Sequence, residues 1–217
     1  FGSSPVITWD SSLDLYRVAD QSGEIFHNRP NRIIRYYKNG VIERLNLILE
    51  EYISSHNLIS SNDVVIDIGA NIGEFSRSVI EKNKNVRILA FEPEELEFMS
   101  LKANLAGCSS EIHNMALWEE SCSRNLYSLN TSGDSSLIQQ SANLNSAVKE
   151  VDCFALDDVI RNSEIVNSDE RIKVVKVEAE GAEPEVLKGM TLTLQRSDYV
   201  CVDVGAERGV EKDSTLI

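Results

Sequence analysis

The sequence predicts an α/β fold with a mostly parallel sheet and helices on both of its faces. Short apolar, β-branched segments alternate with amphipathic segments along most of the 217 residues. This alternation is typical of parallel strands joined by helices. A glycine-bearing turn at 69–73 directly follows the apolar segment 63–68. Such a turn lets a buried strand bring a ligand to the N-terminus of the next helix.

The N-terminal region, residues 1–58, is expected to form a small appendage to a main domain at 59–217. Segments 13–19 and 24–28 have strand character and flank a polar Gln-Ser-Gly stretch, which predicts a hairpin. A helix is expected after this hairpin. Its apolar face consists of Val41, Leu45, Ile48, Leu49, Tyr52 and Ile53.

Five short segments, most of them rich in apolar and β-branched residues, are expected to form the core sheet. They are 63–68, 86–91, 111–115, 172–178 and 198–204. Segments 122–127 and 148–154 also have strand character and predict an inserted edge to this sheet. The polar stretch 119–147 around them has two interpretations of equal weight, a surface excursion or a loop that closes over a ligand.

Helices are expected between the core strands. The helix after the glycine turn has an apolar stripe formed by Phe75, Val79 and Ile80. Pro93 fits the first position of the following helix, which is expected to end at Gly107. Two shorter helices are expected at 157–161 and 183–190.

The overall charge and the cysteines narrow the class of protein. The chain carries 21 basic and 35 acidic side chains, a net charge of −14, which argues against nucleic acid and anionic membranes as partners. No apolar run is long enough for a membrane span. The widely spaced Cys108, Cys122, Cys153 and Cys201 predict reduced, mostly buried thiols of a cytoplasmic protein, with no metal site.

Two acidic residues at strand ends indicate a nucleoside cofactor. Glu92 follows the second core strand, where nucleoside-binding folds place a carboxylate for the ribose hydroxyls. Asp67 stands just before Gly69, where it would repel a pyrophosphate but attract a cationic group. S-adenosylmethionine has an ammonium and a sulfonium and carries no phosphate. The residues therefore favour S-adenosylmethionine over NAD, and an NAD-dependent oxidoreductase is the alternative.

An ordered set of motifs resembles the FkbM-type methyltransferases. The motifs are 67–76, 91–93, 104–105, 114–117, 156–158 and 176–183, with further matches at 135–136 and 187–189. The resemblance covers about residues 60–210. It implies a class I, Rossmann-like fold that methylates hydroxyl oxygens of sugars or natural products with S-adenosylmethionine. Glu178 departs from the pattern, which usually has Asp at this position.

The resemblance also implies roles for individual residues. The methionyl part and the sulfonium would be surrounded by Asp67, Gly69, Ala70, Asn71 and Gly73. Glu92 would hold the ribose. Asn114, Met115 and Ala116 would border the adenine. The acceptor, a small molecule or a glycan, is not specified by the sequence.

Carboxylates at the end of the 172–177 strand are the best-placed catalytic groups, because this edge of a parallel sheet binds ligands. Glu178 and Glu180 are expected to act as a base toward the acceptor hydroxyl or, as an alternative, to bind a divalent ion. Glu183 is interpreted as a favourable charge at a helix N-terminus. Lys176 is expected to pair with one of these carboxylates. A non-catalytic binding module on the same fold is the third possible function.

The C-terminal end of the sheet is expected to be incomplete. Class I methyltransferase sheets, as the resemblance implies, have seven strands, the last two forming an antiparallel edge pair. Residues 205–217 are polar and too few for a helix and two more strands. We therefore expect C-terminal strands to be missing, with the final strand exposed or covered by a partner chain, an arrangement that favours a homodimer.

Overall fold

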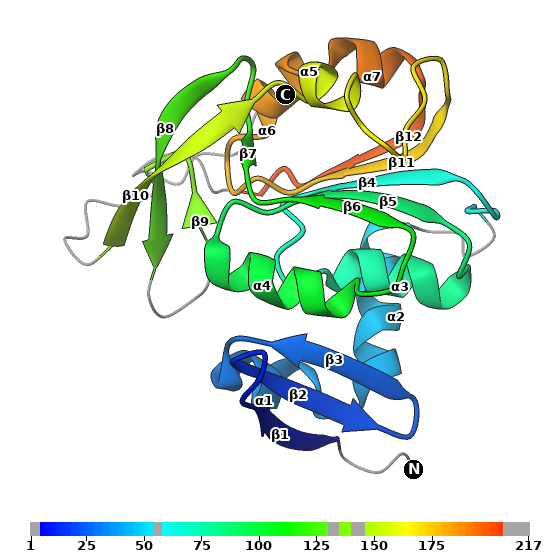
Figure 1. Cartoon of the computed structure of the whole chain (residues 1–217), viewed down its shortest axis with the longest axis vertical. Helices are drawn as coiled ribbons and strands as arrows, with labels where there is room; N and C mark the ends of the chain where they lie inside the picture. The colour runs from blue at the N-terminus through cyan, green and yellow to red at the C-terminus, as the bar shows by residue number, and fades with distance from the viewer. Residues whose placement is uncertain (1–4, 54–57, 130–134, 140–145, 206–217) are drawn as a thin grey trace.

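The core of the protein is a five-stranded parallel sheet with the strand order β12-β11-β4-β5-β6 (Figure 1). The computed structural model describes residues 5–53, 58–129, 135–139 and 146–205. The core strands are β4 (Val64–Ile68), β5 (Arg87–Phe91), β6 (Ser110–His113), β11 (Ile172–Val177) and β12 (Ser197–Val202). All five predicted core strands are confirmed to within a few residues.

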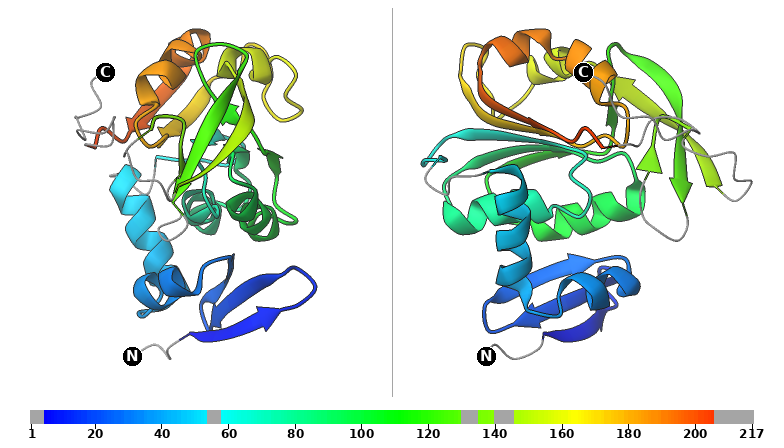
Figure 2. Two further views of the ribbon diagram at one scale, coloured as in Figure 1. Left: turned by 90° about the vertical axis from the view of Figure 1, so that its left-hand side faces the viewer. Right: turned by 180° about the vertical axis from the view of Figure 1, so that it is seen from behind.

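Helices cover both faces of this sheet (Figures 1 and 2). One face packs against α2 (Val41–Tyr52), α3 (Glu74–Lys82) and α4 (Glu95–Asn104), and the other against α5 (Leu156–Ile160), α6 (Glu183–Lys188) and α7 (Thr191–Gln195). Successive strand residues alternate between the two layers. Val65 packs with the first group and Ile66 with the second. Both strand faces are therefore buried, which explains the nearly continuous apolar runs.

The N-terminal region forms a three-stranded antiparallel sheet of β1 (Val6–Asp10), β2 (Leu15–Asp20) and β3 (Gly23–His27), followed by α1 (Pro30–Tyr36). The predicted hairpin corresponds to β2 and β3, whereas β1 and α1 were not predicted. Most residues of β1 are exposed, and Ile33 is the buried residue of α1. β1 consists of strand-forming residues that stay largely exposed, and α1 is short and buries a single side chain.

The side chain of Asn104 joins this N-terminal sheet to the main domain. Its Oδ1 accepts the N–H of Phe26 at 2.7 Å, and its Nδ2 donates to the carbonyls of Phe26 and Ile72 at 2.8 and 2.7 Å. One buried amide thus connects β3, α4 and the glycine turn. The division of the chain at residues 58 and 59 stays a prediction.

A second small sheet stands beside the carboxyl ends of the core strands (Figure 1). It has the order β7-β10-β8-β9, formed by β7 (Ala116–Leu117), β8 (Cys122–Leu129), β9 (Ser135–Ser136) and β10 (Ser146–Phe154). The expectation that 122–127 and 148–154 form an edge of the core sheet is therefore wrong. β8 and β10 pair with each other, and the end of β10 pairs with β7 instead of with the core strand β6.

Three helix boundaries also differ from the prediction. The helix α4 begins at Glu95, and Pro93 lies in the loop before it. This helix ends at Asn104, ahead of Gly107. The helix at 183–190 is shorter than expected, since α6 ends at Lys188 and α7 follows it.

The edges and surface of the described part bear on possible partners. Tyr199 and Val200 of the edge strand β12 are 47% and 37% exposed. Residues 206–217 lie outside the described residues, so the expected loss of C-terminal strands and the homodimer stay predictions.

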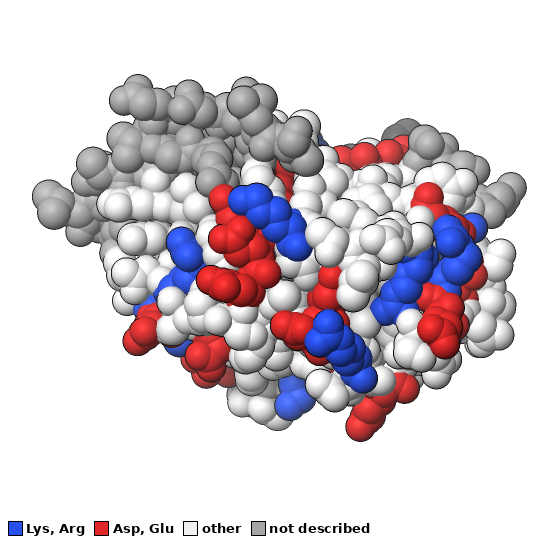
Figure 3. Space-filling model, turned by 90° about the horizontal axis from the view of Figure 1, so that it is seen from above, with Lys and Arg blue, Asp and Glu red and all other residues white. Residues whose placement is uncertain are grey.

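On the face above α5 and α7, basic and acidic side chains are interleaved (Figure 3). No helix within the described ranges is long and apolar enough to cross a bilayer.

Replacing Asn104 by Ala should destabilise the fold by about 1–3 kcal/mol, since three buried or partly buried backbone groups lose their partner. Urea unfolding of the variant and of the parent chain measures this difference. Lys102→Ala, at an exposed position of the same helix, is the control and should stay within about 0.5 kcal/mol of the parent. Equal stability of Asn104→Ala and the parent chain would contradict the role of this side chain.

Candidate functional site

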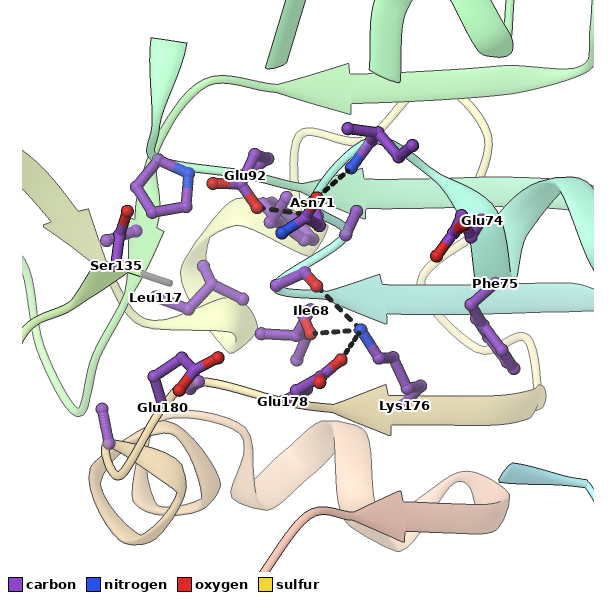
Figure 4. Close-up of a pocket in the computed structure, with 18 of the residues that line it drawn as sticks. Ile68, Asn71, Glu74, Phe75, Glu92, Leu117, Ser135, Lys176, Glu178 and Glu180 are labelled. Atoms are coloured by element: carbon purple, nitrogen blue, oxygen red, sulfur yellow. Dashed lines mark hydrogen bonds and ion pairs between the residues drawn. The ribbon is translucent and has the colours of Figure 1, made fainter. Parts of the chain in front are cut away.

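A cavity of about 410 Å³ opens at the carboxyl ends of the core strands. Parallel α/β sheets bind ligands at this edge. The predicted site residues that line it are Gly69, Ala70, Asn71, Glu92, Ala116, Glu178 and Glu180. Asp67, Gly73 and Asn114 are not part of the lining that the described residues form. Figure 4 shows Glu92 after β5, and Glu178 and Glu180 in the loop after β11, around one space.

The glycine turn between β4 and α3 forms one wall of this cavity. Gly69 has a φ of +70°, and a Cβ at this position would lie 1.8 Å from the Glu178 carbonyl oxygen. Asn71 adopts a φ of +51° without being glycine. Gly73 has a φ of +87° and packs against Leu101 of α4. The glycines therefore permit the turn and its close contact with β11, and the turn presents its backbone to the cavity.

Lys176 forms a buried ion-pair cluster directly behind the turn. Its Nζ lies 2.9 Å from Glu178 Oε2 and 3.2 Å from Asp67 Oδ1, and it donates to the Gly69 carbonyl at 2.7 Å. The expected pairing of Lys176 with a carboxylate is confirmed. Asp67 is fully buried and also accepts a hydrogen bond from Ser76 Oγ. Asp67 thus supports the turn from behind it.

Glu178 lines the cavity, and its side chain is 36% exposed. Burial raises the pKa of this carboxyl, but the Lys176 ammonium and the Tyr52 hydroxyl outweigh that effect and hold the pKa below its ordinary value. Glu178 is therefore ionised near neutral pH. A carboxylate with a lowered pKa is a weak base, so this group is suited to stabilise a positive charge.

Glu92 is the most buried carboxyl group in the cavity wall at 6% exposure. It accepts the N–H of Asn71 at 2.7 Å and the N–H of Glu94 at 2.9 Å. Burial raises its pKa to about 8, against the opposite effect of these two N–H donors. The exposed Asn114 donates from Nδ2 to the Glu92 and Pro93 carbonyls. Asn114 therefore shapes the loop that carries Glu92.

Glu180 stands in the left-handed region with a φ of +50°. The buried Ser136 of β9 donates to its carbonyl at 2.6 Å and fixes this conformation. Glu183 accepts the N–H groups of Ala179 and Gly181, so it stabilises the same loop instead of facing the cavity. Unfavourable backbone conformations of non-glycine residues cluster at functional sites, and Asn71 and Glu180 both line this cavity.

The N-terminal region contributes residues that the sequence analysis did not assign to the site. They are His27, Arg32, Tyr36, Arg44, Ile48, Glu51 and Tyr52. Arg44 holds Glu74 at the start of α3 through two hydrogen bonds, at 2.9 and 2.5 Å. Burial lowers the pKa of His27 to about 4, so its imidazole is neutral at physiological pH. Arg32 belongs to a group of basic residues in the sequence, Arg29, Arg32, Arg35 and Lys38, and this group was the available signal.

Residues of the small sheet and of the segment directly after β9 form another part of the cavity wall. Ser135, Leu126 and Leu137 line the cavity. The described parts of the stretch 119–147 are thus mainly strands beside the site, and residues 130–134 and 140–145 lie outside the described ranges. No group of three His, Cys, Asp or Glu side chains is arranged to hold a metal ion in the part that the structure describes.

Comparison with known proteins identifies the class of this chain. Residues 67–213 match the family described as the methyltransferase FkbM domain. The chain belongs to this family, which has the class I methyltransferase fold, and the resemblance seen in its motifs is confirmed.

Two curated relatives agree with this assignment. The methyltransferase sdnD of Sordaria araneosa is 31% identical over 197 residues, covering 72% of this chain and 73% of that protein. The hexuronic acid methyltransferase AglP of Haloferax volcanii is 33% identical over 221 residues, covering 100% of this chain and 76% of that protein. This chain is therefore a methyltransferase, and the oxidoreductase alternative loses its support.

Replacing Gly69 by Ala should destabilise the protein severely, because the new Cβ would collide with the Glu178 carbonyl. Gly107 provides a matched control, since it has a φ of +76° but no atom within 4 Å of an added Cβ. Gly107→Ala should cost only about 1–2 kcal/mol, the usual cost of a left-handed conformation. Urea unfolding of both variants measures the two effects, and equal costs would contradict the close contact between the turn and β11.

Proposed function

We propose that this enzyme transfers the methyl group of S-adenosylmethionine to a hydroxyl oxygen of a sugar or natural product. The observation that carries this proposal is the juxtaposition of the glycine turn and Glu92 on one cavity wall. The two are joined by the hydrogen bond from the Asn71 N–H to the Glu92 carboxylate. A backbone turn beside a buried carboxylate suits an amino-acid group and a ribose.

The proposed cofactor site follows the cavity lining from β4 to β6. The backbone of Gly69, Ala70 and Asn71 would border the methionyl part, and Glu92 would accept hydrogen bonds from the ribose hydroxyls. Met115, Ala116 and Leu117 would border the adenine, since all three line the cavity. Asp67, Gly73 and Asn114 would act indirectly, by supporting the turn, the start of α3 and the Glu92 loop.

Methyl transfer needs little from the protein beyond alignment and a proton acceptor, because the sulfonium of the donor already supplies the electrophile. The chain must hold the acceptor oxygen in line with the methyl group and exclude water. We assign the role of proton acceptor to Glu180. Its neighbour Glu178 would instead stay ionised and stabilise positive charge, as its lowered pKa favours.

The acceptor side of the cavity favours a polyhydroxylated molecule. Glu51 and Tyr36 come from the N-terminal region, and both line the cavity together with Glu178 and Glu180. Carboxylates and phenolic hydroxyls bind sugar hydroxyls by hydrogen bonds. The relative AglP is named for methylation of a hexuronic acid, and this supports a glycan or sugar-acid acceptor here. The free cysteines of the chain support a cytoplasmic location.

The cofactor assignment is tested by calorimetric titration with S-adenosylhomocysteine. Glu92→Ala should weaken binding by about 1–3 kcal/mol, because the ribose hydroxyls lose a buried partner. Glu95→Ala, at an exposed position nearby, should bind as the parent chain does. Unchanged affinity in Glu92→Ala would remove this residue from the cofactor site.

The pH dependence of the same titration tests the protonation state of Glu92. Its pKa of about 8 in the free protein means that the group is largely protonated at pH 7, whereas ribose hydroxyls donate best to the ionised form. Binding should therefore release a proton at pH 7, and affinity should rise between pH 7 and 9. Glu92→Gln should show neither effect. A flat pH profile in the parent chain would contradict the assignment.

The catalytic role of Glu180 is tested with labelled S-adenosylmethionine and a panel of hexuronic acids and neutral sugars. Glu180→Gln should retain affinity for S-adenosylhomocysteine and lose about 10²–10⁴-fold in turnover, because the amide cannot accept a proton. Glu120→Gln, at an exposed position, is the control. Parent-like turnover in Glu180→Gln would refute the role as base. A parent chain that binds S-adenosylhomocysteine but methylates no acceptor would favour a non-catalytic binding module.

A further inference from the structure

Two of the four cysteines face each other across a pair of strands outside the catalytic residues. Cys122 of β8 lies directly opposite Cys153 of β10 in the antiparallel register. Opposite residues of such a pair have Cα atoms about 4.5–5.5 Å apart and side chains on the same face. A disulfide needs a Cα separation of about 4.4–6.8 Å. The register alone therefore places these two residues within bonding range.

The two thiols are in contact but differ in their surroundings. Cys153 is fully buried, and burial, with a smaller effect from Cys122, raises the pKa of its thiol to about 12. Cys122 is partly exposed. An oxidant in solution therefore reaches Cys122 first and finds Cys153 next to it as the second thiol. A thiol beside an oxidised cysteine is the arrangement that leads to a disulfide.

The pair packs beside residues that line the cavity. Cys153 is also opposite Ala116 of β7, and Leu126 of β8 packs in the same apolar cluster. Ala116 and Leu126 both line the cavity. A covalent bond between β8 and β10 would therefore fasten the small sheet that forms this side of the site.

We propose that Cys122 and Cys153 form a reversible cross-strand disulfide when the protein meets a peroxide. In the first step, the Cys122 thiol is oxidised by one peroxide molecule to a sulfenic acid, and one water molecule is released. In the second step, the Cys153 sulfur attacks the Cys122 sulfur, the S–S bond forms, and the hydroxyl leaves with the Cys153 proton as a second water molecule. Two thiols are oxidised and one peroxide is reduced.

The remaining cysteines provide internal controls. Cys108 and Cys201 both pack against the cluster formed by α2, α3 and their face of the core sheet. The Cys201 thiol donates to the Tyr52 carbonyl at 3.0 Å. Neither is part of the apolar cluster that contains Cys122 and Cys153. The proposal thus requires that Cys122 forms a disulfide with Cys153 and not with Cys108 or Cys201.

The test is disulfide mapping of the reduced chain after treatment with hydrogen peroxide under native conditions. Free thiols are then alkylated, and the chain is digested without reduction. The expected product is one linked peptide pair containing Cys122 and Cys153, with an intact mass lower by two hydrogens and restored by dithiothreitol. The melting temperature should rise by about 5 °C or more on oxidation and fall again on reduction.

Cysteine variants test whether the pairing of Cys122 with Cys153 is specific. Cys108→Ser should still form the link, whereas Cys122→Ser should leave Cys153 reduced and should show no rise in melting temperature with peroxide. A link to Cys108 or Cys201 in the parent chain would overturn the proposal. Conversion of Cys122 to the sulfinic acid without any link to Cys153 would also overturn it. Both results are independent of whether the chain binds S-adenosylhomocysteine.

Discussion

The buried ammonium of Lys176 is the interaction on which the arrangement of the site depends. It joins Asp67 at the end of β4, the carbonyl of Gly69 and the carboxylate of Glu178 after β11. A buried charge is tolerated only when it is paired and hydrogen-bonded. The three partners therefore hold two neighbouring strand ends and the glycine turn at one point. The turn can then present its backbone to a ligand without moving.

The N-terminal region completes the cavity through a second set of polar contacts. Asn104 joins β3 to the glycine turn, and Arg44 and Tyr37 hold Glu74 at the beginning of α3. These contacts place α2 against the main domain, so that Tyr52 donates to Glu178. This side of the cavity is thus built by residues that precede the matched family region, 67–213, in the chain.

The sequence predicted the core sheet well and the surroundings of the site less well. Strands buried on both faces leave continuous apolar runs, as at Val64–Ile68, and such runs are visible without a structure. The sequence also indicated which residues stand near the ligand edge, but not which way they face. Asp67 and Asn114 support the site from behind because of contacts with Lys176 and the Glu92 loop. The small sheet was misplaced because its attachment to β7 involves only Ala116 and Leu117.

The central claim is that the cavity at the strand ends binds the methyl donor in one orientation. The methionyl part would lie at the glycine turn, the ribose at Glu92 and the adenine at the Met115–Leu117 segment. A crystal structure of the chain with S-adenosylhomocysteine tests this claim most directly. We expect the ribose hydroxyls on the Glu92 carboxylate, the adenine beside Ala116 and the sulfur on the side of Glu178 and Glu180. A ligand bound outside this cavity, or bound in it with the adenine at Glu178, would contradict the account.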